Sequence, residues 1–254
     1  QTTPRLDELA ADGILFERCL SQTAHTMPTF TTIVTGQTPM THGIVGTLYA
    51  HPDEPDQILG DTHPVLAEQF RNAGTTTAAF DNLLDFGCVP KWFARGYDWY
   101  VNTTAEGHCS QVLGEQINAR LVPWLGEHAG EPMFLFVHYW DAHQRYNQPE
   151  PYRSIHAEGP RPERADIAGR GFYPRWGWED RLPEERIDYL NLYDGDISYG
   201  DACVGEVLDT LRKQGEYDDA WIFFTADHGE DMEEHNAPFE HREPYEHTCH
   251  VPLI

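Results

Sequence analysis

The chain has 254 residues, and its 42 acidic and 17 basic side chains give a formal net charge of −25 at pH 7. Hydrophobic residues make up 40% and aromatic residues 12%, so the chain can bury a sizeable core and is not a disordered tail. The negative charge excludes a general nucleic-acid binder and a polybasic membrane anchor, because both need the opposite sign. The five scattered cysteines indicate neither a disulfide framework nor a zinc ribbon.

The basic residues are unusual in kind, because only Lys91 and Lys213 are lysines and the other fifteen are arginines. So much acid with so little lysine resembles proteins from salt-loving archaea, in which high salt screens the repulsion between acids. An ordinary acidic enzyme is the alternative. No run approaches 18 apolar residues and no signal peptide is visible, so we expect no membrane segment and a cytoplasmic location.

Hydrophobic periodicity predicts helices and strands in alternation along the chain. Helices are expected at 4–12, 28–35, 64–73, 110–127 and roughly 184–213. Strands are expected at 14–19, 75–80, 133–138 and 220–225. The last two strands are continuous apolar runs, which are typical of strands buried on both faces of a parallel sheet. The order predicts a single α/β domain over residues 1–254, with a doubly wound, mainly parallel sheet sandwiched by helices.

One stretch, residues 144–182, breaks this pattern as an irregular insertion. It has five prolines, no periodicity and seven of the fifteen arginines, among them Arg145 and Arg153. Loops of this length are usually functional or disordered. We interpret it as part of a lid in which Arg145 contacts an anionic substrate. The alternative is an irregular surface segment whose arginines pair with the abundant acids.

Polar residues follow three of the predicted strands, at the rim where open α/β sheets bind ligands. His138 to His143 follow one strand, Asp227 and His228 follow another, and His25 to Thr29 follow the first. An Asp-His pair after a buried strand can offer an oxygen and a nitrogen to a divalent metal. The alternative for any single histidine is an ordinary hydrogen-bonded residue.

Four segments, in this order and spacing, resemble the sulfatase family of the alkaline phosphatase superfamily. The opening TPRLDELAADGILFERCLSQTAHTMPTFTTIVTGQTPMTHGI resembles the family's start and nucleophile region. FLFVHYWDAHQRYNQPEPY and YDGDISYGDACVGEVLDTLRKQG resemble two central motifs. FTADHGEDMEEH, followed by YEHTCHVPLI, resembles the metal-binding segment and the strand after it. The resemblance implies the alkaline-phosphatase-like α/β fold.

The resemblance also implies roles for individual residues. Thr26 corresponds to the nucleophile at a helix N-terminus, where it would also contact the metal, and Asp227 and His228 correspond to metal ligands. His143 corresponds to the histidine that contacts the anion or assists the leaving group. The metal is a divalent ion, with Ca, Mn, Mg and Zn all left open.

Two further residues correspond to the substrate side of the family's site. Asn82 resembles a polar residue of the phosphonate-hydrolase branch, and His241 lies where relatives carry a lysine or histidine facing the anion or the metal. With Arg145 they are the predicted substrate-binding residues. The expected partner is a small anionic ester; the oligomeric state is not indicated.

The nucleophile region departs from the family's formylglycine motif, C/S-x-P-S/A-R. Here the stretch reads Thr26, Met27, Pro28, Thr29 and Phe30. Threonine is not a substrate for oxidation to formylglycine, and Phe30 replaces the arginine. We therefore expect a formylglycine-independent enzyme that uses the unmodified hydroxyl, as in the phosphodiesterase and phosphotransferase branches. The alternative for Thr26 is a plain helix N-cap.

The resemblance implies a first strand before Thr2, with metal-binding aspartates, and a C-terminal subdomain after the last residue, so we expect a longer parent protein. A truncated relative with an impaired metal site is the alternative. The predicted function is metal-dependent hydrolysis of sulfate or phosphate esters. Phosphoryl transfer and a catalytically inactive binding module of the same fold are the alternatives.

Overall fold

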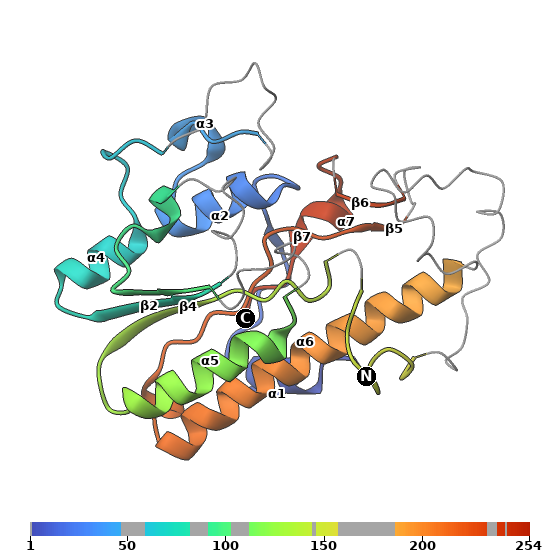
Figure 1. The fold of residues 1–254 in the computed structure, drawn as a ribbon. Coiled ribbons are helices and arrows are strands. Elements are labelled where there is room, and N and C mark those ends of the chain that lie inside the picture. The colour runs from blue at the N-terminus through green and yellow to red at the C-terminus, as the bar shows by residue number, and fades with distance from the viewer. Residues whose placement is uncertain are drawn as a thin grey trace.

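The fold is built on a parallel sheet with helices on both faces (Figure 1). The computed structural model describes residues 2–46, 59–81, 91–102, 112–143, 146–156, 186–232, 238–241 and 243–254. Predictions for Asn82, for Arg145 and for most of 144–182 lie outside these residues. None of the described helices is both long enough and apolar enough to cross a membrane.

The sheet has the strand order β3-β2-β4, with β2 (Thr76–Phe80) between β3 (Trp99–Val101) and β4 (Met133–Val137). Both pairings are parallel, and Phe80 lies opposite Val101 on one side and Val137 on the other. The chain segments that follow β2 and β4 therefore leave the sheet at the same edge. This confirms the predicted parallel α/β class.

Helices form a layer on each face of the sheet (Figure 1). One layer holds α2 (Thr26–Thr35), α3 (Pro39–His42) and α4 (Leu66–Asn72). The other holds α5 (Gly114–Glu127), α6 (Arg186–Gln214) and α1 (Pro4–Asp12). The five predicted helices are thus confirmed to within a few residues at their ends.

The remaining elements are short. They are β1 (Cys19–Leu20), η2 (Lys91–Ala94), η4 (Tyr217–Asp219), β5 (Asp231–Met232), β6 (Pro238–Glu240), α7 (Glu246–Cys249) and β7 (His250–Val251). Strands β1 and β7 pair antiparallel, as do β5 and β6. The elements from β5 to β7 form the part of the chain that follows Thr225, and β1 pairs with the last of them.

The core lies between the sheet and its two helical layers. On α5, Ile117, Leu121 and Leu125 are buried at intervals of four residues, which places them on one face of the helix. From the other layer, Phe30 of α2 packs edge-on against Phe136 of β4, with the ring centroids 6.0 Å apart. Packing on both faces fixes the relative positions of α2 and β4, and so of the groups at their ends.

The prediction of a buried strand at 220–225 is wrong for the described residues. The segment is extended, but Phe224 pairs only with Ile254, and a single antiparallel bridge joins Thr225 to Leu253. Trp221 and Phe223 remain 91% and 75% exposed. A strand is buried only where neighbours cover both of its edges and faces, and the described residues supply a neighbour on one edge.

The predicted strand at 14–19 is likewise reduced to β1. Ile14, Leu15 and Phe16 are exposed, and the Phe16 N–H donates to the Leu253 carbonyl. This segment and 223–225 therefore pair with the same C-terminal residues. Several of their apolar side chains are exposed, as is that of Trp221.

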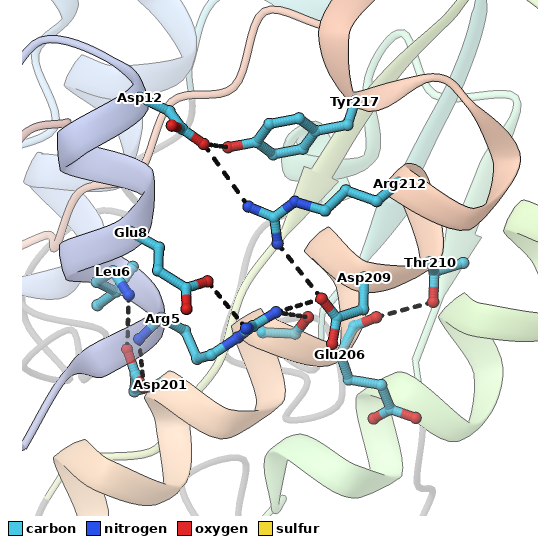
Figure 2. Close-up of polar contacts among 11 residues, drawn as sticks. Arg5, Leu6, Glu8, Asp12, Asp201, Glu206, Asp209, Thr210, Arg212 and Tyr217 are labelled. Atoms are coloured by element: carbon cyan, nitrogen blue, oxygen red, sulfur yellow. Dashed lines mark hydrogen bonds and ion pairs between the residues drawn. The ribbon is translucent and has the colours of Figure 1, made fainter.

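Helix α1 docks on α6 through the carboxylate of Asp201 (Figure 2). The first turn of a helix leaves backbone N–H groups without intrahelical partners. Thr3 at the N-cap of α1 does not cap with its side chain, whereas Asp201 accepts the N–H groups of Arg5 and Leu6 at 3.1 and 2.8 Å. Asp201 of α6 therefore accepts hydrogen bonds that an N-cap side chain of α1 would otherwise accept.

A series of ion pairs extends this contact toward the C-terminal ends of α1 and α6 (Figure 2). The Arg5 guanidinium pairs with Glu8 and with Asp209 of α6. Asp209 also pairs with Arg212, which lies over the Tyr217 ring at 4.2 Å. These pairs orient α1 along α6.

Candidate active site

Thr26 lies at the first position of α2, with its side chain buried against a loop 202 residues away. His25, not Thr26, occupies the N-cap, and its side chain makes no capping hydrogen bond. The N-cap alternative for Thr26 is therefore wrong. The Thr26 hydroxyl instead lies 3.3 Å from His228 Nε2. A helix N-terminus favours the anion that would form or bind there.

The sequence of α2 explains why this threonine-rich segment is buried. Thr31 and Thr35 donate their hydroxyls to the carbonyls of Met27 and Thr31, one turn back, so neither buried hydroxyl lacks a partner. Pro28 lies in the first turn, where no intrahelical N–H bond is lost. Gly36, with φ of 66°, ends the helix. The Thr26 hydroxyl is thereby fixed on a rigid element.

Asp227 and His228 lie on the loop after the extended segment 220–225. The loop packs on α7, because the Gly229 N–H donates to the Thr248 carbonyl at 2.7 Å. A side chain at Gly229 would collide with the backbone carbonyl of His247, so glycine is required at this close approach. The C-terminal segment thus holds the Asp-His pair opposite Thr26.

The tautomer of His228 follows from its hydrogen bonds. Its Nδ1 lies 2.9 Å from the Gly229 carbonyl, which can only accept, so Nδ1 carries the proton in the neutral ring. The unprotonated Nε2 then faces Asp227 Oδ2 and Thr26 Oγ1, each at 3.3 Å. A carboxylate oxygen, an imidazole nitrogen and a hydroxyl therefore face one small volume.

This donor set fits part of the coordination shell of a divalent cation. Ligands about 2.1 Å from one ion stand roughly 3.0–3.4 Å apart, which matches the two 3.3 Å separations. Among the residues with described positions, however, no group of three or more His, Cys, Asp and Glu side chains is arranged to hold a metal ion. Asp227, His228 and Thr26 would need further ligands to complete a site.

His241 packs against His228, with stacked rings whose centroids are 4.0 Å apart. Its Nδ1 lies 3.2 Å from a Glu230 carboxylate oxygen. Burial, followed by the neighbouring His228, lowers the pKa of His241 to about 3, so the ring is neutral near pH 7. A neutral imidazole stacked on His228 can donate or accept a hydrogen bond without adding charge.

His143 completes the cluster from the loop after β4. Its ring lies 5.8 Å from the His241 ring and 5.4 Å from Trp140. The structure thus brings five of the seven predicted site residues into one region: Thr26, His143, Asp227, His228 and His241. Asn82 and Arg145 lie outside the described residues, so their predicted roles remain predictions.

Two residues near the site were given no role from the sequence. The ring centroids of His25 and His241 are 6.5 Å apart. The pKa of His25 is lowered by burial and by the neighbouring His241 and His228. Glu230 is buried and contacts His241. The sequence feature that could have indicated both residues is their position, because His25 precedes Thr26 and Glu230 closely follows the Asp-His pair.

A polar pair lies at the ends of the two neighbouring parallel strands. Asp81, fully buried after β2, lies 2.8 Å from His138 Nδ1 after β4, and it also accepts the Tyr100 hydroxyl at 2.6 Å. His138 contacts Trp140 at 4.9 Å between ring centroids, and Trp140 contacts His143. The strand ends are therefore joined to the site through tilted and edge-to-face ring contacts.

A protein-family model described as Sulfatase matches residues 1–254. The chain belongs to the sulfatase family. The family match covers all of the sequence segments discussed above, and the parallel α/β architecture agrees with it. This sulfatase-family chain is also similar to several other proteins and solved structures.

Three relatives illustrate the range of that similarity. The multifunctional alkaline phosphatase superfamily protein PehA of Trinickia caryophylli is 31% identical over 139 residues, which are 46% of this chain and 27% of PehA. The phosphonate monoester hydrolase of Agrobacterium radiobacter has a TM-score of 0.74 and 21% identity, covering 99% of this chain and 62% of that one.

The third is the C-terminal periplasmic domain of phosphoethanolamine transferase EptC from Campylobacter jejuni. Its TM-score is 0.62 at 16% identity, covering 99% of this chain and 69% of that domain. The structural similarities confirm the fold. The sulfatase-family chain spans less than two thirds of the length of PehA and of the phosphonate monoester hydrolase.

Proposed function

We propose that this sulfatase-family chain is the catalytic part of a divalent-metal-dependent hydrolase of sulfate or phosphate esters, with the unmodified Thr26 hydroxyl as nucleophile. The observation that carries the proposal is the position of Thr26 Oγ1, 3.3 Å from His228 Nε2 at the N-terminus of α2. The backbone N–H groups of that helix end favour an anionic ester beside the hydroxyl.

Thr26 would act by in-line attack. Its hydroxyl passes its proton to solvent as Oγ1 bonds to sulfur or phosphorus, and the bond to the leaving oxygen breaks. His143 donates a proton to the leaving oxygen, and water then opens the Thr26 ester. A divalent cation held by Asp227 and His228 would lower the pKa of the hydroxyl and neutralise the ester's oxygens. Asn82, His241 and Arg145 are the proposed substrate contacts.

Replacing Thr26 tests the proposal directly. The full-length protein would be assayed with p-nitrophenyl sulfate, p-nitrophenyl phosphate, bis(p-nitrophenyl) phosphate and p-nitrophenyl phenylphosphonate. Thr26→Ala should lower kcat by several orders of magnitude, since loss of a nucleophile removes the covalent step. The melting temperature should stay near that of the wild type, because Thr26 is not the N-cap.

The matched control is Thr32→Ala on the same helix. Thr32 donates its hydroxyl to the Pro28 carbonyl and lies away from His228, so its loss should leave kcat within a few-fold. Substantial activity in a folded Thr26→Ala protein would contradict the nucleophile assignment. No activity of the wild type on the whole panel would instead support a binding module.

Transfer to an alcohol is the second candidate, supported by the structural similarity to the phosphoethanolamine transferase domain. Both reactions share a Thr26 ester and differ only in what opens it. Adding glycerol or ethanolamine to the assay and measuring the transferred product separates them. A product ratio above that expected from the acceptor's share of the solvent would favour the transferase.

A further inference from the structure

His143 is carried by a tight turn with an unusual backbone. The His143 N–H donates to the Trp140 carbonyl at 2.9 Å, which closes the turn over Asp141 and Ala142. Ala142 has φ of 75°, in the left-handed region that is strained for a non-glycine residue. An alanine in this conformation must be held there by contacts from outside the turn.

The outside contact comes from α6. Asp196 accepts the Ala142 N–H through Oδ2 at 2.9 Å, across 54 residues of sequence. Asp196 is 2% exposed, and its other oxygen has no hydrogen-bond partner among the described residues. The carboxyl is therefore positioned by packing, and it accepts a backbone hydrogen bond from the residue next to His143.

Asp141, inside the same turn, is pressed against the same helix. A Cβ added at Gly200 of α6 would lie 3.7 Å from the Asp141 Cβ, an ordinary contact distance, so the turn lies against the helix without requiring glycine there. A Cβ at Gly114, the first residue of α5, would lie 3.0 Å from Asp141 Oδ2, so glycine at this position makes room for the side chain. The turn is thus packed between two helices, and Asp196 accepts a hydrogen bond from its backbone.

Two buried acids side by side would repel each other if both were ionised. Burial raises the pKa of Asp196 to about 7 and, with the neighbouring Asp196, raises that of Asp141 well above its ordinary value. At neutral pH the pair therefore carries less than its full charge. A partly protonated pair can stay buried and keep the turn in place.

We propose that Asp196 is a positioning residue for His143: by holding the Ala142 N–H, it keeps the turn in the conformation that aims the imidazole at the leaving oxygen of the ester. This inference rests on the proposed function, because it gives Asp196 a role in the protonation step assigned to His143. Asp196 itself does not touch the substrate.

The test compares esters with good and poor leaving groups. Proton donation matters most for a poor leaving group, so Asp196→Ala should lower kcat on a phenyl ester by about 10- to 100-fold. The corresponding p-nitrophenyl ester should be affected much less, and KM little. Asp196→Asn keeps an oxygen acceptor for the Ala142 N–H and should restore most of the lost activity.

His143→Ala should show the same leaving-group pattern. If Asp196 acts through His143, the double variant should be no slower than His143→Ala alone, because the two substitutions remove one function. Additive losses would overturn the proposal. So would an equal loss on both esters, or a failure of Asn to rescue.

The matched control is Asp201→Ala. Asp201 is also buried on α6 and also accepts backbone N–H groups, but those belong to α1. It should lower stability without changing the ratio of the two ester rates. If Asp196→Ala does not fold, Asp196→Val fills the space while removing the acceptor, and the same ratio is measured.

Thr26→Ala separates this inference from the proposed function. If Thr26→Ala stays active, the function assigned to the site fails, whatever Asp196 does. If Thr26→Ala is inactive and Asp196→Ala slows both esters alike, only the positioning role fails.

Discussion

At the residue scale, the proposed chemistry depends on three atoms that folding brings together. Asp227 Oδ2 and His228 Nε2 come from one loop and Thr26 Oγ1 from a helix end, with the shared nitrogen 3.3 Å from each oxygen. The hydrogen bond from His228 Nδ1 to the Gly229 carbonyl turns the lone pair of Nε2 toward the other two atoms. One small volume therefore collects oxygen and nitrogen donors.

We expect this volume to bind a divalent cation, so Asp227→Asn and His228→Ala should each lower the metal content. His228→Ala removes a nitrogen ligand, and Asp227→Asn replaces a charged carboxylate with a neutral amide, which binds the cation more weakly. Metal would be measured by elemental analysis after dialysis, with Glu243→Gln as the control. Stoichiometric metal retained by both variants would show that the ion is bound elsewhere.

The raised pKa of Asp196 predicts that the free energy of unfolding depends on pH. Its pKa is about 7 in the folded protein against an ordinary 3.8, so the folded state holds the proton more tightly than the unfolded chain. The stability from this proton is complete below about pH 4 and is lost as pH rises to about 7. Asp141, whose pKa is raised by burial and by the neighbouring Asp196, shares the effect.

Asp196→Asn, which cannot ionise, should therefore raise the free energy of unfolding by about 1–3 kcal/mol at pH 8. Near pH 4 the difference from the wild type should be close to zero. Urea denaturation across this range measures it, with the exposed Asp61→Asn as the control. A gain that is equal at both pH values would contradict the assigned titration.

At the element scale, α1 depends on α6 for its first turn. Asp201 replaces an N-cap by accepting two backbone N–H groups, and the Arg5 guanidinium continues the contact to Asp209 (Figure 2). A helix of nine residues is too short to be stable alone, so this docking decides whether it forms.

Asp201→Ala should lower the free energy of unfolding by about 1–3 kcal/mol, because two N–H groups lose a buried acceptor. Chemical denaturation measures the change. Glu8→Gln is the control: Glu8 pairs with Arg5 at the surface, where such a pair contributes less than about 1 kcal/mol. Equal losses in the two variants would argue against capping by Asp201.

At the scale of the whole molecule, the net charge of −25 sets the electrostatic conditions for folding. Repulsion between surface acids weakens the compact state at low salt, and its range falls from about 10 Å at 0.1 M to about 3 Å at 1 M salt. We predict that the melting temperature rises as KCl increases from low concentration and levels off near 1 M. A melting temperature that falls or stays constant would contradict adaptation to high salt.

Sequence patterns were sufficient to predict the parallel α/β class, the helix positions and five candidate site residues that lie close together in the structure. Helix and strand periods are local, and the sulfatase-like motifs mark the loops after 138 and 226 as well as the start of α2. Local patterns could not show which strands have neighbours on both edges. The apolar run 220–225 therefore looks buried in sequence, yet exposes Trp221 and Phe223.

The contacts between distant segments at the candidate site became visible only in the tertiary structure. That Thr26 faces His228 rather than capping its own helix depends on a loop 202 residues away. That Asp196 holds the turn of His143 depends on a contact across 54 residues. A sequence pattern records which face of an element is apolar, but a hydrogen bond between distant loops depends on how several elements pack, and no local period encodes it.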